Sequence, residues 1–184
     1  MKKNLDLEAL KFPIGPFSCP TDIEKEDLEQ WKTAVREFPR QLNTLLEPLT
    51  RTQLQWPYRP EGWNIKQVVH HLADSHLNAF TRLKLTLTED APVIRPYEEA
   101  LWAVLPDGLN DDLSASLKII EGVHERWFYV LTHLSDTDWN RVYFHPQHQK
   151  LVGLKEMLGL YAWHGRHHLA HIEQAIFHHG NFDV

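Results

Sequence analysis

The sequence has few cysteines, no long apolar run and no excess of basic residues. Cys19 is the only cysteine among 184 residues, so no intrachain disulfide can form. With no secretory signal at the N-terminus either, we expect a cytoplasmic protein. No apolar run approaches the roughly 20 residues that span a bilayer, so we expect no membrane partner. The formal net charge of −6 disfavours binding to nucleic acid and leaves small molecules as the expected partners.

The length and composition predict one domain over residues 1–184. A chain of 184 residues with 42% hydrophobic content can bury a single core, and the sequence contains no internal repeat. The first 20 residues include Pro13, Pro16 and Pro20 and show no lasting periodicity. We therefore expect residues 1–20 to form an extended arm on the surface of the domain.

Apolar residues recur at helical spacing in four long segments. The predicted helices cover residues 21–49, 65–88, 113–134 and 154–179, with a short helix over residues 98–105. Thr21 with Glu24 matches a capping box, Asn64 can cap the second helix, and Gly180 can end the last one. The pattern predicts an all-α four-helix bundle, in which ligands and metals bind between facing helices.

Residues 140–153 break the helical pattern before the last helix. The β-favouring residues at 142–144 face Leu151 and Val152 across the segment Pro-Gln-His-Gln at 146–149. We expect a short hairpin or an irregular loop inserted at this point.

Two histidine-rich windows, residues 68–76 and 163–171, hold seven of the 13 histidines. Imidazole is the commonest metal ligand, and histidines four apart on a helix can chelate one ion. The last helix offers two such pairs, His164 with His168 and His167 with His171. On a helical wheel the charged residues mark the opposite face from the first pair, so we choose His164 and His168 as inward-facing.

An HxxxH pair is a modest signal by itself. Histidines in a core can instead hydrogen-bond to their neighbours and hold no metal. The pair also lacks the glutamate of the HExxH peptidase motif, because Gly165 stands at that position. Peptidase chemistry of that type is therefore not expected.

His71 heads a polar stripe on the second helix. Ser75, Asn78 and Arg82 follow it at steps of four, three and four residues, so they stack on one face. The stripe is either a solvated face or the lining of a functional cavity, and periodicity does not separate the two. We take Ser75, Asn78, Arg82 and, on the last helix, Tyr161 as candidates for contacting substrate.

The remaining histidines of the predicted helices are interpreted structurally. His76 points toward the apolar centre of its helix, where a hydrogen-bonded core histidine is expected, and His124 is treated in the same way. His178 and His179 are placed in the last helical turn, where positive charge suits the carbonyl end.

Several stretches resemble the DinB-like four-helix-bundle superfamily, in particular its YfiT-type branch of metal-dependent hydrolases. They are residues 63–87 (WNIKQVVHHLADSHLNAFTRLKLTL), 94–97 (IRPY), 144–146 (FHP) and 158–172 (LGLYAWHGRHHLAHI). The similarity covers most of the chain beyond the arm. In that family a histidine of a His-Leu-Ala segment joins two from an HxxxH segment. The resemblance thus implies His71, His164 and His168 as ligands of one divalent metal.

Three imidazoles leave at least one coordination position open, which is the catalytic arrangement for zinc. Zinc is the expected metal, and nickel also accepts imidazole. A metal there can lower the pKa of bound water, which gives a hydrolase that acts on a small molecule. It can instead lower the pKa of a bound thiol, which gives a bacillithiol-type S-transferase that detoxifies electrophiles. Because protons compete for imidazole, affinity should fall as the pH drops through about 6.5.

A third hypothesis is a metal-binding bundle without catalysis, closed by a fourth protein ligand. His145 is the nearest candidate in the sequence for that ligand. No carboxylate is clearly placed as a general base, so the catalytic group of the chain stays open. The resemblance and the content of seven tryptophans lead us to expect a homodimer, because exposed aromatic patches tend to be interfaces.

Overall fold

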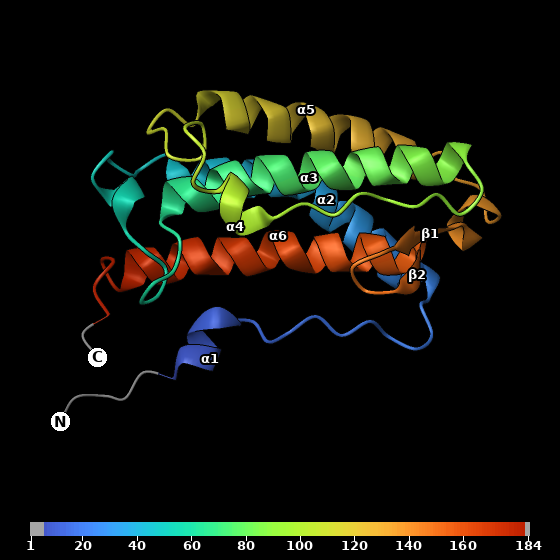
Figure 1. The fold of residues 1–184 in the computed structure, drawn as a ribbon, viewed down its shortest axis with the longest axis horizontal. Helices are drawn as coiled ribbons and strands as arrows, with labels where there is room; N and C mark the ends of the chain where they lie inside the picture. The colour runs from blue at the N-terminus through green and yellow to red at the C-terminus, as the bar shows by residue number, and fades with distance from the viewer. Residues whose placement is uncertain (1–5, 183–184) are drawn as a thin grey trace.

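Four long helices lie side by side in the computed structural model, which describes residues 6–182 (Figure 1). They are α2 (Lys25–Leu46), α3 (Ile65–Thr88), α5 (Ser114–Leu131) and α6 (Leu154–Phe177). Both α2 and α3 pack against α5 and α6. The predicted all-α four-helix bundle is confirmed. None of the helices in residues 6–182 combines the length and the apolar character needed to cross a membrane.

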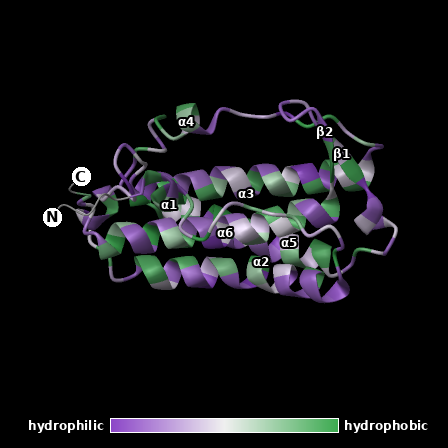
Figure 2. Cartoon of the chain, turned by 90° about the horizontal axis from the view of Figure 1, so that it is seen from below, coloured by the Kyte–Doolittle hydropathy of each residue, from purple (hydrophilic) through white to green (hydrophobic). Residues whose placement is uncertain are grey.

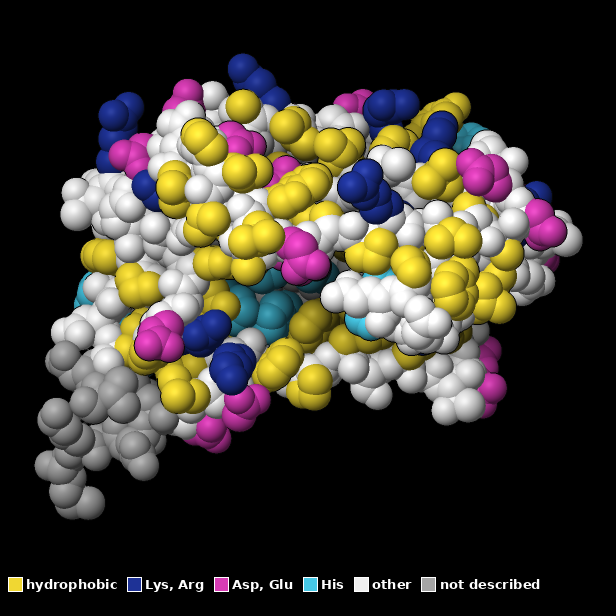
Figure 3. Space-filling view, viewed as in Figure 1, with side chains coloured by type: hydrophobic (Ala, Val, Ile, Leu, Met, Phe, Trp, Pro, Cys, Tyr) yellow, Lys and Arg dark blue, Asp and Glu magenta, His cyan; other side chains and the backbone are white. Residues whose placement is uncertain are grey.

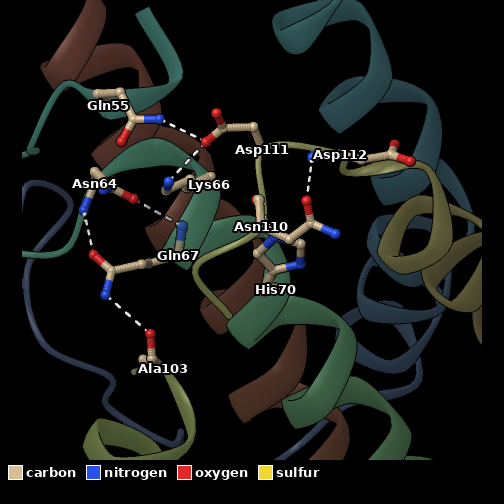
Figure 4. Close-up of polar contacts among 9 residues, drawn as sticks. All are labelled: Gln55, Asn64, Lys66, Gln67, His70, Ala103, Asn110, Asp111 and Asp112. Atoms are coloured by element: carbon tan, nitrogen blue, oxygen red, sulfur yellow. Dashed lines mark hydrogen bonds and ion pairs between the residues drawn. The ribbon is translucent and has the colours of Figure 1, made fainter. Parts of the chain in front are cut away.

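Neighbouring helices α3 and α5 run in the same direction, as do α2 and α6 (Figure 1). The connection between α3 and α5 must therefore return along the whole bundle. Residues 89–113 form this crossover, which contains the short helix α4 (Glu99–Trp102). At its far end the crossover is fastened to the start of α3, where Lys66 Nζ lies 2.7 Å from Asp111 Oδ1 and Gln67 donates to the carbonyl of Ala103 (Figure 4).

Local sequence explains where the helices begin and end. The side chain of Asn64 accepts a hydrogen bond from the Gln67 N–H at 3.0 Å, and α3 begins and ends as predicted. The predicted start of α2 at Thr21 is wrong, because the carboxylate of Asp27 accepts the Glu24 N–H and the helix begins only at Lys25. The predicted helices over 98–105 and 113–134 are each shorter in the structure.

The last helix ends earlier than predicted. Gly180 has a φ of +65° just beyond α6, a conformation that glycine adopts without strain and that stops a helix. The helix itself ends at Phe177, so His178 and His179 follow it rather than forming its last turn.

The N-terminal arm follows α6 on the outside of the bundle (Figure 1). Within it, helix α1 (Leu7–Lys11) contradicts the expectation of an extended segment, because Asp6 caps a short run of helix-favouring residues. Trp163 of α6 donates to the carbonyl of Gly15 at 3.1 Å, and Gln174 donates to that of Leu10 at 3.0 Å. These bonds fix the arm against α6.

The insertion before α6 is a hairpin of β1 (Val142–His145) and β2 (Lys150–Gly153), which confirms the first of the two predicted forms. It lies on the same side of the bundle as α4 (Figure 2). The crossover is hydrogen-bonded to β1, because Phe144 donates to the carbonyl of Pro92 at 2.9 Å and accepts from Ile94 at 3.1 Å. Arm, crossover and hairpin therefore surround the exposed seam between α3 and α6.

The apolar core is divided into two clusters along the bundle. One is centred on Leu83, Trp127 and Met157, and the other on Leu42, Leu72 and Ile172. Between them, on α3, α5 and α6, lie buried histidines, including His76 and His124 at 1% and 2% exposure. A polar layer therefore crosses the middle of the core.

Candidate metal centre

Helices α3 and α6 bring His71, His164 and His168 together. Their ligand nitrogens all lie within 4.8 Å of one another, and His71 Nε2 is 3.3 Å from His164 Nε2. His71 comes from α3, while the other two are one turn apart on α6. His71 and His168 are buried and His164 is half-buried. The three side chains selected from the sequence are thus neighbours in space.

Burial keeps these imidazoles neutral. It lowers the pKa of His71 to about 4, with a smaller contribution from His167, and lowers the pKa values of His164 and His168 well below 6.5. Neutral imidazole is the form that binds metal. Protons should therefore compete for the site only at a more acidic pH than the value of about 6.5 expected from unperturbed histidine.

The donor set fits a divalent transition metal. Three neutral nitrogens suit zinc or nickel, whereas magnesium and calcium prefer oxygen ligands. Among the described residues, His145, the candidate fourth ligand of the non-catalytic hypothesis, is not in this group. It lies instead beside His148, with ring centroids 4.2 Å apart, and its buried Nδ1 has no hydrogen-bond partner. The group of three thus leaves room for a further ligand from solution.

A second group consists of His167, His168 and His171, whose ligand nitrogens also lie within 4.8 Å of one another. Its nitrogens are already engaged in part. His171 Nε2 is 3.0 Å from the carbonyl oxygen of Lys11, and its Nδ1 is 3.3 Å from His168 Nδ1. His167 stacks on Trp163 with ring centroids 4.4 Å apart. His171 is therefore held by the arm and by His168.

The group of His71, His164 and His168 lines a pocket of about 740 Å³. Histidine side chains are visible at the bottom of a hollow on this face of the molecule (Figure 3). The arm contributes Phe12 and Phe17 to the pocket walls, the crossover contributes Tyr97, and the hairpin contributes Tyr143 and His145. Aromatic walls around a polar floor are typical of small-molecule sites.

Most of the polar stripe beneath His71 faces this pocket. Ser75 and Arg82 line it together with Tyr161. Asn78 does not; its amide donates to the carbonyl of Asp74 at 2.9 Å, and it lies in a neighbouring hollow with Tyr97. For Ser75 and Arg82, the stripe is a cavity lining rather than a solvated face.

The pocket presents hydrogen-bond donors. Burial raises the pKa of Tyr161, against smaller opposing effects of Arg82 and Ser75, so this phenol is protonated at neutral pH. Burial likewise raises the pKa values of Tyr97 and Tyr143. The Nε of Arg82 is buried without a hydrogen-bond partner. These groups can donate to an oxygen atom of a bound molecule.

Sequence interpretation missed the pocket walls, because they come from segments outside the long helices. Phe12, Phe17 and Tyr143 meet only through the fold. The expected hydrogen bonding of the core histidines is present: His76 Nδ1 lies 2.6 Å from His124 Nε2. The contact of His76 with His164 could not be read from the sequence.

Comparison with known proteins identifies the family of this helix bundle. The model of the DinB superfamily matches residues 34–172, and the chain belongs to that family. “Putative metal-dependent hydrolase YfiT” of Bacillus subtilis is 43% identical over 165 residues, covering 90% of this chain and 93% of the relative. A relative in Halalkalibacterium halodurans, which carries the same description, is 42% identical over 166 residues, covering 90% and 96%.

The solved structure of YfiT from Bacillus subtilis superposes with a TM-score of 0.90 at 42% identity, covering 94% of this chain and 98% of that one. It is described as “a probable metal-dependent hydrolase with an unusual four-helix bundle topology”. In the present fold, α3 and α5 are parallel neighbours (Figure 1). The resemblance identified in the sequence is confirmed.

Proposed function

We propose that this protein is a metal-dependent hydrolase of small molecules, in which His71, His164 and His168 hold one divalent ion. The observation that carries the proposal is the convergence of three neutral imidazoles at the floor of a 740 Å³ pocket. Zinc is our first choice of metal and nickel the second. When bound, the ion would supply an acidified water at an open coordination position.

The chain itself would bind and orient the substrate. Arg82 offers its guanidinium to an oxygen on which negative charge develops, and the protonated phenol of Tyr161 can donate a second hydrogen bond. Ser75 completes this donor set. The aromatic side chains Phe12 and Phe17 of the arm would cover the apolar part of the substrate and exclude water. Asn78 is the weakest of the four substrate candidates, since it lies outside the pocket.

The test is an activity assay on zinc-loaded and nickel-loaded protein. One panel contains esters and amides, and the other combines low-molecular-weight thiols with a chlorinated electrophile. The proposal expects turnover in the first panel that is lost in His164→Ala. Turnover only with thiols would assign the alternative, a bacillithiol-type S-transferase. Metal binding without turnover in either panel would leave the non-catalytic bundle.

We extend the proposal to a cytoplasmic homodimer. Several large apolar side chains are exposed, among them Leu101, Val104 and Phe177 at 64%, 56% and 79%. Apolar surface of this kind is common at interfaces. Light scattering at micromolar concentration should return twice the chain mass, and a monomer mass would count against the dimer.

A further inference from the structure

A row of hydrogen bonds crosses all four long helices and ends at the metal centre. It begins at the carbonyl oxygen of Val35 on α2, which lies 2.6 Å from His124 Nδ1 on α5. His124 Nε2 is 2.6 Å from His76 Nδ1 on α3. His76 Nε2 is in turn 3.1 Å from His164 Nδ1 on α6.

The carbonyl at one end sets the direction of every bond in this row. A carbonyl oxygen can only accept, so His124 must carry its proton on Nδ1 and present a lone pair at Nε2. That lone pair accepts from His76 Nδ1–H, which leaves His76 Nε2 to accept from His164 Nδ1–H. His164 then has its lone pair on Nε2, the atom 3.3 Å from His71 Nε2.

A shorter row acts on the second ligand of α6. The carbonyl oxygen of Lys11 in the arm accepts from His171 Nε2–H at 3.0 Å. His171 Nδ1 therefore carries the lone pair and accepts from His168 Nδ1–H at 3.3 Å. His168 is left with its lone pair on Nε2 as well.

Packing prevents these rings from turning or exchanging partners with water. Phe38 packs on both His76 and His124, with ring centroids 5.0 and 5.1 Å apart. His171 stacks on Tyr58 at 3.8 Å. His76 and His124 are only 1% and 2% exposed, and a charge buried this deeply without an opposite charge is strongly disfavoured, so each ring is neutral and carries one proton.

We propose that the carbonyl groups of Val35 and Lys11, acting through His124, His76 and His171, fix the tautomers of His164 and His168. Both ligands then present Nε2 lone pairs to the ion before it binds. His76, His124 and His171 are positioning residues, and the proposal rests on the metal centre proposed above. Outer hydrogen bonds of this kind orient histidine ligands and strengthen their binding.

The first test measures zinc affinity by competition with a chromophoric chelator. Replacing His76 by phenylalanine removes the acceptor for His164 Nδ1–H and should weaken zinc binding about 10–100-fold. The matched control is His70→Phe. His70 lies on the same helix at 7% exposure, but its ring bonds to Ser116 Oγ at 2.8 Å and to the Asn110 carbonyl beside it (Figure 4). This control should leave affinity close to wild type.

The second test separates a row of hydrogen bonds from two independent packing effects. His124→Phe should weaken zinc binding although His124 touches none of the three ligands. The double variant His76→Phe with His124→Phe should bind no more weakly than His76→Phe alone, because His124 acts only through His76. His76→Gln keeps one donor and one acceptor and should recover part of the affinity. Additive losses, with no recovery by glutamine, would overturn the proposal.

The third test reads the tautomers directly in the metal-free wild-type protein. Nitrogen-15 NMR of the histidines should find the proton of His164 and of His168 on Nδ1. Protons on Nε2 would overturn the proposal. Because this test uses only the wild-type protein, its result does not depend on whether any variant folds. If wild type and His164→Ala both fail to bind zinc, the proposed metal centre is wrong. If His76→Phe binds zinc as tightly as wild type, only the proposed role of the hydrogen-bonded row is contradicted.

Discussion

His164 and His167 lie three residues apart on α6 and have different surroundings. His164 faces His71 across the seam, whereas His167 stacks on Trp163 beneath the arm. We predict that His164→Ala loses the metal and that His167→Ala keeps it, because only the first removes a ligand. Elemental analysis of the purified variants measures this directly.

Circular dichroism supplies the control for this pair. The metal-free His164→Ala protein should remain helical, because apolar clusters at both ends of the core hold the bundle together. Equal metal retention by the two variants would contradict the assignment of His164, and loss in His167→Ala alone would favour the second histidine group.

At the scale of an element, glycines decide how closely α6 approaches α2. A Cβ added at Gly165 would lie 2.8 Å from Cδ2 of Phe38, whose ring is enclosed by His76 and His124. Gly165→Ala should therefore destabilise the protein by up to about 2 kcal/mol, since overpacking costs about 1–3 kcal/mol and the higher helix propensity of alanine offsets about 1 kcal/mol of this.

Gly122 of α5 is the matched control, because a Cβ there would meet nothing within 4 Å. Gly122→Ala should stabilise the protein by about 0.5–1 kcal/mol. Urea unfolding of both variants measures the difference. A stabilising effect of Gly165→Ala would show that the close approach of α2 and α6 does not require a glycine at position 165.

At the scale of the whole molecule, the buried histidines make stability depend on pH. In the unfolded chain a histidine has a pKa of about 6.5, while burial lowers the pKa of His124 to about 4 and that of His171 to about 3. Between these values the unfolded chain binds more protons than the folded one. Stability is therefore complete above pH 6.5 and is lost progressively as the pH falls toward 4.

The effect of His124 alone is about 3 kcal/mol, because each pKa unit corresponds to about 1.4 kcal/mol. We predict that the unfolding free energy of the metal-free protein, from urea titrations between pH 7.5 and 4.5, falls steeply below pH 6.5. The dependence should be shallower in His124→Phe. Constant stability across this range would mean that these rings have the same pKa in the folded and the unfolded state.

The sequence by itself determined the long helices, their number, both ends of α3 and the start of α6. Side-chain direction repeats every 3.6 residues in a helix, so apolar spacing located each helix, and the local chemistry of Asn64 fixed where α3 begins. The same periodicity turned His164 and His168 inward on one face. Such features need only residues close in sequence.

Only the tertiary structure decided which of these faces meet. Periodicity gives the direction in which a side chain leaves the axis of its own helix, but it does not say which other helix lies opposite. His76 and His124 are 48 residues apart and come into contact because the crossover sets α3 beside α5. The pocket walls likewise combine arm, crossover and hairpin, whose placement follows from long-range packing and backbone hydrogen bonds rather than from any local pattern.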